Sequence, residues 1–457
     1  DLTEKMGYLV DLENPYITYE NDYIETLWQL LKRLYDKGYL YKGYTIQPYS
    51  PAAGTGLSSH ELNQPGTYRD VKDTTAVAQF AVKASPNAYS VLGDMSLPTY
   101  FLAWTTTPWT LPSNTALAVG KKIDYVLVAT YNQYTGQAIQ VVLAKDLLGK
   151  YFSEEATMET YQVGDKKLPM RLIKSFKGEE LLGITYEQLL PYAQPEEGDA
   201  FRVIAGDFVT TEDGTGIVHI APSFGGDDFR VAQQNGIGAL TLVDKRGRFV
   251  EAVSDFANEF VKEQYLSEEE KEAERIKQGR DKYLSVDERI AIKLKQENKA
   301  FKVEKYEHSY PHCWRTDKPI LYYPLESWFV KTTAVKSRLV ELNKTINWKP
   351  ESTGTGRFGN WLENLVDWNL SRSRYWGTPL PIWRSEDGSS EICIGSIEEL
   401  SREAKKALDA GVEENRSLEW NGDLLNIELH KPYVDRVVLI DDKGTKLYRE
   451  SDLIDVW

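Results

Sequence analysis

Between residues 66 and 319 the hydrophobic pattern of the chain changes. Apolar residues there come in short runs rich in Val, Ile, Tyr and Thr, separated by Gly, Asp, Asn and Pro; examples are YFLAWTTT, DYVLVATY, AIQVVLAK, FRVIAGDFVT and GIVHIAP. Runs of this kind favour β-strands joined by turns. The segment therefore predicts a barrel-like or sandwich-like β unit, with a helical insertion at about residues 260–297.

The segments on either side have a different pattern. In residues 1–65 a set of apolar side chains keeps the spacing of one helix face, and Gly38 is placed to end that helix. The set is Ile24, Leu27, Trp28, Leu31, Leu34 and Tyr35. Residues 320–457 return to mixed helix and strand. We therefore predict an α+β protein in which a β domain, residues 66–319, is inserted between two parts of another domain.

Composition narrows the class of protein. A net charge of −15 excludes a broadly cationic nucleic-acid coat but leaves a local basic groove open. The charged run at residues 267–297 is typical of a solvated helix. No stretch reaches the about 18 apolar residues that a membrane span needs. With only two cysteines, a disulfide framework is excluded and a cytoplasmic location is expected.

The run AWTTTPWTLPSNTALAV, residues 103–119, places Thr105, Thr106 and Thr107 directly before Pro108 and Trp109. A purely structural explanation suffices for this run alone. Threonine is β-branched and fits a strand, and proline ends the pairing of that strand.

A second motif, EDGTGIVHIAPSFGGDDF, spans residues 212–229 and has His219 in mid-strand and the adjacent carboxylates Asp227 and Asp228. Each residue alone has an ordinary explanation, the histidine as a half-buried strand residue and the aspartates as a helix cap. Beside the threonine run, however, they indicate one pocket that offers hydroxyls, a neutral imidazole and a carboxylate able to hold an ammonium group.

Taken together, these motifs resemble a known family. WTTTPWTLPSN and GTGIVHIAPSFGGDDF are followed in order by YPHCWRTDKPILYY and SRSRYWGTPLPIW, and PYSPAAGTGLSSHEL precedes them. The set is similar to the class I aminoacyl-tRNA synthetases, most closely the isoleucyl family. The valyl and leucyl relatives carry Thr-Thr-Arg-Pro where this chain has Thr106-Thr107-Pro108-Trp109, and the valyl relatives carry Lys at the position of His219.

The resemblance implies an architecture. The β-rich middle corresponds to the family's editing domain, and residues 1–65 and 320–457 correspond to partial segments of its nucleotide-binding, Rossmann-like catalytic domain. The family's H-I-G-H and K-M-S-K-S signatures do not occur in the sequence. We therefore expect an internal piece of a longer enzyme that does not activate amino acids and has no cofactor of its own. ATP and Mg²⁺ belong to the parent enzyme.

The resemblance also implies a function. The parent enzyme ligates isoleucine to tRNA(Ile), and this piece hydrolyses misacylated Val-tRNA(Ile) with a positioned water. The implied partners are tRNA(Ile), especially its 3′-terminal adenosine, and valine and isoleucine as esters; we expect a monomer and no membrane. The implied catalytic residues are Thr105, Thr106, Thr107 and Asp228. The implied substrate-binding residues are Trp109, Asn114, His219 and Asp227.

One departure from the family concerns zinc. Many members bind zinc through two C-x-x-C pairs, but here the first region reads QPYSPAAG and the second keeps only Cys313. A closed site needs four ligands, so we predict no metal, although His312 beside Cys313 leaves a two-ligand alternative open. Two other functions also stay open: a tRNA-binding module without hydrolytic activity, and an unrelated β-barrel that binds a carbohydrate or nucleotide.

Overall fold

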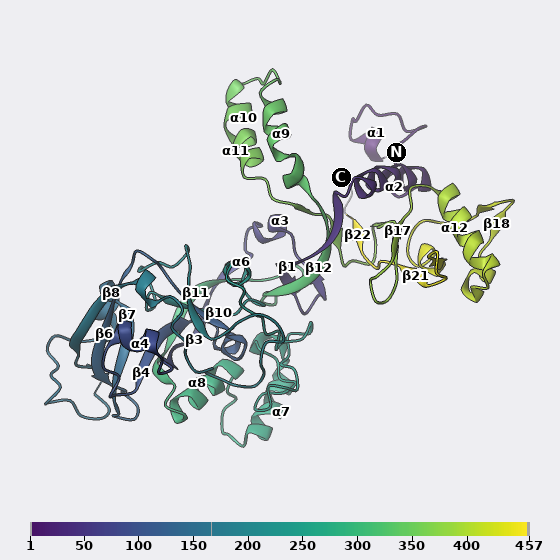
Figure 1. Cartoon of the computed structure of the whole chain (residues 1–457). Helices are drawn as coiled ribbons and strands as arrows, with labels where there is room; N and C mark the ends of the chain where they lie inside the picture. Colours follow the sequence, from purple (N-terminus) through teal and green to yellow (C-terminus); the bar gives the residue numbers. More distant parts are fainter. Residues whose placement is uncertain (1, 166, 455–457) are drawn as a thin grey trace. The chain divides into compact units, whose positions relative to one another are not determined.

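The structure is a computed structural model that describes residues 2–165 and 167–454 (Figure 1). The chain divides into two units, each described here by itself. Unit 1 combines Asp1–Tyr44 with Glu326–Trp457, and unit 2 is Thr45–Leu325. The strand-rich segment predicted from the sequence, residues 66–319, lies within unit 2, which extends further at both ends.

A curled sheet dominates unit 2. In the described residues it contains β3 (Tyr68–Ala81), β4 (Thr99–Thr105), β5 (Ala116–Val119), β6 (Asp124–Tyr131), β7 (Ala138–Ala144), β8 (Arg171–Lys177), β9 (Arg202–Ala205), β10 (Ile217–Ile220) and β11 (Ala300–Pro311). The order is β8-β6-β7-β4-β10-β5-β9, and β3 pairs with both β4 and β11. Strand β4 is parallel to β7 and β10, whereas β10 is antiparallel to β5.

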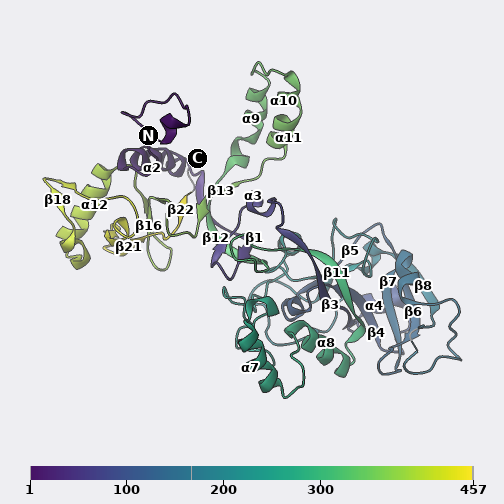
Figure 2. The same cartoon turned by 180° about the vertical axis from the view of Figure 1, so that it is seen from behind.

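The strand sequences match their places in this sheet. DYVLVATY of β6 and AIQVVLA of β7 are apolar almost throughout and are buried on both faces. RLIKSFK of β8 is largely exposed and carries three cations, which suits an edge strand because charged residues discourage pairing with another chain. Strands β3 and β11 form a long antiparallel ribbon (Figure 2).

Helices flank the sheet of unit 2. They are α3 (Ser59–Leu62), α4 (Pro86–Leu92), α5 (Leu148–Tyr151), α6 (Gly226–Gln234), α7 (Glu268–Gln278) and α8 (Val286–Gln296). Capping boxes begin α7 at Ser267 and α8 at Ser285, so the helical insertion expected near 260–297 is confirmed. Helix α7 buries no residue, as the charge run predicted. Helix α8 belongs to the same charged run but buries one face, including Ile290 and Leu294, beside β3 and β11, so the prediction of a solvated helix is wrong for this part of residues 267–297.

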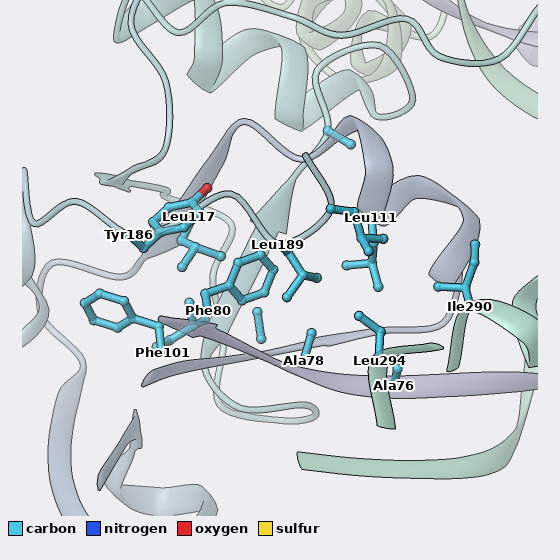
Figure 3. Close-up of a cluster of buried hydrophobic side chains, with 14 of the residues drawn as sticks. Ala76, Ala78, Phe80, Phe101, Leu111, Leu117, Tyr186, Leu189, Ile290 and Leu294 are labelled. Atoms are coloured by element: carbon cyan, nitrogen blue, oxygen red, sulfur yellow. The ribbon is translucent and has the colours of Figure 1, made fainter. Parts of the chain in front are cut away.

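The core of unit 2 lies between the sheet and α8. Phe80 of β3, Phe101 of β4 and Leu117 of β5 are fully buried in it together with Tyr186 (Figure 3). The 3₁₀ helix η1 (Pro108–Ser113) contributes Leu111 to this cluster, and α8 contributes Ile290 and Leu294. Helix α8 and η1, far apart in sequence, therefore share one core.

Unit 1 contains the helix predicted from its apolar face. Helix α2 spans Asn21–Asp36 and buries Ile24, Trp28 and Leu31, and Gly38 follows its end with φ +71°, which confirms the prediction. Trp28 meets Trp383 edge to face at 6.0 Å and donates from Nε1 to the Pro379 carbonyl oxygen at 2.8 Å. This helix is thus fixed by both apolar burial and a hydrogen bond.

The other helices of unit 1 are α1 (Leu2–Lys5), α9 (Lys336–Asn343), α10 (Glu351–Thr355), α11 (Arg357–Glu363) and α12 (Ile397–Asp409). Its short strands are β13 (Trp368–Asn369), β14 (Ser371–Arg372), β15 (Thr378–Pro379), β16 (Ile382–Arg384), β17 (Glu391–Cys393), β18 (Trp420–Asn421), β19 (Leu424–Leu425), β20 (Leu439–Ile440), β21 (Lys446–Arg449) and β22 (Leu453–Ile454). The remaining strands are β1 (Leu40–Ser50), β2 (Thr55–Gly56) and β12 (Leu321–Val330). Within the described residues, no helix is long and apolar enough to cross a membrane.

Candidate functional site

The threonine run begins at the last residue of strand β4. The strand ends at Thr105 and η1 begins at Pro108, so the proline does end the strand as expected. Thr105 is buried, and its Oγ1 accepts from the Thr107 amide at 3.1 Å and lies 3.3 Å from Thr107 Oγ1. Thr107 Oγ1 lies 3.4 Å from Thr110 Oγ1. The hydroxyls of Thr105, Thr107 and Thr110 thus form a continuous chain. Thr106 is half-buried.

His219 joins this chain from β10. Its Nε2 lies 3.1 Å from Thr110 Oγ1, which donates its proton to the Thr107 carbonyl oxygen at 2.8 Å. A hydroxyl has one proton, so while Thr110 donates to that carbonyl it accepts from Nε2–H of His219. Burial lowers the pKa of His219 to about 4, so the imidazole is neutral at pH 7. Nδ1 is buried and has no hydrogen-bond partner in the described residues.

The two adjacent aspartates at the start of α6 have different surroundings. Asp228 Oδ2 accepts from the Ala221 amide at 2.8 Å, just beyond the end of β10. Burial raises the pKa of Asp228 to about 7. Asp227 is exposed, and Arg230 donates to its Oδ1 at 3.0 Å and to Asp207 at 2.7 Å. Asp228 thus lies beside the strand of His219, whereas Asp227 faces solvent.

Trp109, the residue before Thr110, belongs to a pair of aromatic side chains. Trp109, the second residue of η1, is buried and meets Phe224 edge to face at 5.1 Å between ring centroids. The Trp109 amide donates to Asp287 Oδ1 at 2.8 Å, and its indole Nε1 is buried without a partner in the described residues. The two rings therefore form a buried aromatic contact that restrains the residue next to Thr110.

Asn114 is buried behind η1. Its Nδ2 donates to the carbonyl oxygens of Ala116 at 2.9 Å and Ile220 at 3.4 Å, and its Oδ1 accepts from the Tyr186 hydroxyl at 2.7 Å. These contacts tie the start of β5 to the end of β10, next to His219. The predicted role of Asn114 in substrate binding stays a prediction.

The structure brings together Thr105, Thr107, His219, Trp109 and Asp228 around one end of β4 and β10. It adds three residues that were not singled out from the sequence. Thr110 and Phe224 lie inside the two quoted motifs, where their spacing from Thr107 and His219 was a usable signal. Asp287 had no such signal, because it is remote in sequence and a polar residue on a helix face is ordinarily solvated.

The metal prediction concerns the segment around Cys313. Both Cys313 and His312 are buried, and His312 Nδ1 lies 3.0 Å from the Tyr310 carbonyl oxygen. Among the residues that the structure describes, no group of three or more His, Cys, Asp or Glu side chains is placed to hold a metal ion.

The arrangement around His219 can position polar substrate atoms and a water by hydrogen bonding, and Asp228 can bind a cation.

Sequence comparisons identify similar proteins. The family model of tRNA synthetases class I (I, L, M and V) matches residues 1–457. An isoleucine–tRNA ligase of Cytophaga hutchinsonii is 68% identical over 470 residues, covering 100% of this chain and 41% of the relative. An isoleucine–tRNA ligase of Bacteroides fragilis is 58% identical over 485 residues, covering 100% of this chain and 42% of the relative. The chain therefore spans about two fifths of the length of these curated relatives.

Solved structures match more weakly. GlLeuRS-CP1 has a TM-score of 0.32 at 14% identity, over 51% of this chain and 99% of that chain. The editing domain of P. knowlesi cytosolic leucyl-tRNA synthetase has a TM-score of 0.29 at 14% identity, over 36% of this chain and 62% of that chain. The sequence matches alone therefore indicate the family.

Proposed function

The chain belongs to the class I tRNA synthetases that act with isoleucine, leucine, methionine and valine, and we propose that it is part of an isoleucine–tRNA ligase whose unit 2 hydrolyses Val-tRNA(Ile). The implied partner is tRNA(Ile), which presents its 3′-terminal adenosine and the ester to unit 2. The hydrolysis needs no cofactor. ATP and Mg²⁺ would serve the ligation reaction, for which the flanking segments would supply parts of a nucleotide-binding domain.

A second, hydrolytic site answers a limit on selectivity. Isoleucyl enzymes are the standard example of this limit, because one methylene in an apolar pocket is worth only about 1 to 3 kcal/mol. Valine is therefore attached to tRNA(Ile) at a low rate. A site that accepts the valyl ester and rejects the larger isoleucyl ester restores accuracy.

The single observation that carries the proposal is the hydrogen-bonded chain from Thr105 through Thr107 and Thr110 to His219, with the Asp228 carboxyl nearby. Hydroxyls are both donors and acceptors, so they can hold the ester and orient a water toward its carbonyl carbon. The water oxygen bonds to this carbon, and the water proton passes to the ribose oxygen that leaves. No covalent intermediate with the protein is required.

Asp228 supplies the anchor in this proposal. The α-amino group of an aminoacyl ester is cationic, and a carboxylate that accepts from it forms a charge-assisted hydrogen bond of about 1.5 to 3 kcal/mol. Burial, with a smaller contribution from the charge of Asp227, raises the pKa of Asp228 to about 7. A bound ammonium lowers this pKa, since an opposite charge favours the ionised carboxyl. The Asp228 carboxyl is therefore ionised to a greater extent with the substrate bound than without it.

Trp109 and His219 would limit the size of the bound side chain. Trp109 is held against Phe224, and His219 is held by Thr110. Both side chains are buried, so they cannot swing away without breaking these contacts. A rigid wall can reject the additional methylene of isoleucine, because any overlap must be relieved by moving packed atoms.

The proposal is tested by deacylation. The chain is incubated with Val-tRNA(Ile) and, separately, with Ile-tRNA(Ile), and the released amino acid is measured over time. We expect rapid release of valine only, and loss of this release in Asp228→Ala. Asp207→Asn, which removes an exposed carboxylate outside the hydroxyl chain, is the matched control. Binding of tRNA without release of valine contradicts the proposal and favours the binding-module alternative.

A further inference from the structure

The main chain of η1 is held by a buried carboxyl from a remote helix. Pro108 has no amide proton, so the first N–H group of η1 belongs to Trp109. This N–H donates to Asp287 Oδ1 at 2.8 Å. Asp287 lies in the first turn of α8 and is 7% exposed. Burying a carboxyl is costly, so one that accepts from a single amide at the edge of a site calls for an explanation.

Charged groups surround Asp287 inside unit 2. Burial raises its pKa to about 7, while the charges of Lys262 and Lys305 lower it and that of Asp73 raises it. Lys262 is 4% exposed and pairs with Asp73 at 3.0 Å, and His308 Nε2 lies 3.2 Å from the same Asp73 oxygen. The Asp287 carboxyl is thus influenced by the charges of a largely buried Lys262–Asp73 pair as well as by its hydrogen bond to the Trp109 amide.

The hydrogen bond fixes the part of η1 that bears the site. Thr107 precedes η1 and Thr110 lies within it, so the main chain at Trp109 sets the contact between these two hydroxyls and the contact of the Thr110 hydroxyl with His219. It also sets the position of the Trp109 ring against Phe224. Leu111 anchors the same turn in the core shared with Ile290 and Leu294 of α8 (Figure 3). Helix α8 therefore holds η1 in place both by apolar packing and by the hydrogen bond from the Trp109 amide to Asp287.

We infer that Asp287 is a positioning residue for the hydrolysis: through the Trp109 amide it sets both the hydroxyl geometry and the size limit of the site. The inference rests on the proposed function of unit 2. Asp287 does not contact the substrate in this scheme. Its effect on the reaction passes through Trp109 and Thr110.

The test compares Asp287→Ala with Asp287→Asn. The alanine variant leaves the Trp109 amide without an acceptor, whereas the asparagine side-chain oxygen can accept the same proton. We expect Asp287→Ala to lower kcat for Val-tRNA(Ile) by about tenfold to a hundredfold, as small displacements of reacting groups do, with KM changed much less. We expect the ratio of valyl to isoleucyl hydrolysis to fall as well. Asp287→Asn should restore both quantities to within about threefold of the unchanged chain, because the hydrogen bond is kept.

Two controls separate positioning from folding. Asp281→Ala removes an exposed carboxylate in the loop before α8, and melting temperatures are measured for every variant so that assays run below each transition. Amide hydrogen exchange of residues 105–113 should accelerate in Asp287→Ala and not in Asp287→Asn. An alanine variant that melts lower but keeps kcat and the valyl-to-isoleucyl ratio overturns the inference and leaves the proposed function standing. An unchanged chain that hydrolyses neither ester overturns the proposed function, and the inference with it.

Discussion

Asp227 and Asp228 are neighbours in sequence with opposite surroundings. Arg230 satisfies Asp227 at the surface, whereas Asp228 is held by the Ala221 amide and meets no cation in the hydrogen bonds and ion pairs of the described residues. A carboxyl that pays a desolvation penalty without a counter-ion is typical of a functional site. The adjacent pair thus separates into a surface ion pair and a group that is available for a cationic ligand.

The raised pKa of Asp228 predicts how stability varies with pH. The pKa of Asp228 is about 7 in the folded protein and the ordinary value of an aspartate is 3.8, so between these values the folded state binds more protons than the unfolded state. The free energy of unfolding therefore falls as pH rises through this interval, by at most about 4 kcal/mol from this group. Asp228→Asn keeps an acceptor for Ala221 and removes the titration. In urea titrations we expect the variant to gain stability relative to the unchanged chain as the pH rises from about 4 to about 7. An equal pH slope in both proteins contradicts the assignment.

His219 and Trp109 predict a change of selectivity. In the proposed site, replacing either with alanine removes a wall of the substrate pocket. We therefore expect hydrolysis of Ile-tRNA(Ile) to rise about tenfold or more, which is the scale that one methylene is worth. Trp109→Ala also costs about 3 to 5 kcal/mol of stability because it empties a buried site. The release of isoleucine from Ile-tRNA(Ile) is measured for each variant and for the unchanged chain. If both variants still spare the isoleucyl ester, the size limit lies in other residues.

At the scale of elements, much of the fold followed from local patterns. The face from Ile24 to Tyr35 predicted α2, the charge run predicted solvated α7, and Pro108 predicted the end of β4. These succeeded because periodicity, charge and proline act within a few residues of one another. The contact of Asp287 with Trp109 depends on how α8 packs on η1, so no local pattern contains it.

For the candidate site, too, the sequence predicted individual residues but not the tertiary contacts between them. The motifs predicted that the threonines, His219 and Asp228 share one pocket. They did not predict the hydroxyl chain that links Thr105, Thr107 and Thr110 to His219, because the pairing of β10 beside β4 is a tertiary property. The different surroundings of Asp227 and Asp228 depend on the direction of α6 relative to β10. Asn114 carried no sequence signal for its contact with Tyr186, which is equally remote.

The start of α6 predicts the effect of a single methyl group. A Cβ at Gly225 would lie 2.8 Å from Asp228 Cγ, whereas a Cβ at Gly226 would meet nothing within 4 Å. Gly225 has φ −148°, which alanine also adopts, so Gly225→Ala displaces the carboxyl with little backbone strain. We expect about a tenfold rise in KM for Val-tRNA(Ile).

Gly226→Ala is the matched control for that change. It lies at the first position of α6 and should stabilise the helix by up to about 1 kcal/mol, with KM unchanged. Deacylation kinetics and thermal melts of both variants make the comparison. Equal KM values in the two alanine variants would show that the Asp228 carboxyl tolerates displacement.

At the scale of the whole molecule, the two units have separate hydrophobic cores. One cluster in unit 1 surrounds Trp28 and Trp383, and the main cluster of unit 2 surrounds Phe80 and Leu117. Every residue assigned to the hydrolysis belongs to unit 2. Stability and hydrolysis can therefore be perturbed in different units.

Trp28→Ala tests this separation. Trp28 is fully buried and donates a hydrogen bond to Pro379, so its loss should cost unit 1 about 3 to 5 kcal/mol. We expect kcat for Val-tRNA(Ile), per folded molecule and at saturating substrate, to remain within about twofold, the scatter of uncoupled sites. Circular dichroism melts and deacylation assays at low temperature give the two quantities. A large fall in kcat with unit 2 still folded contradicts the separation.

The pairing of Val218 with Trp104 governs which changes of chain length the protein tolerates. Insertions in exposed loops, such as that at residues 153–160, lengthen the path between β4 and β10 without moving either strand. One residue added inside β10 is different, because side chains alternate between the two faces of a sheet and His219 would turn to the opposite face. Related chains that keep this chemistry are thus free to vary their loops, while the spacings from Thr105 to Thr110 and from His219 to Asp228 are expected to be retained residue for residue.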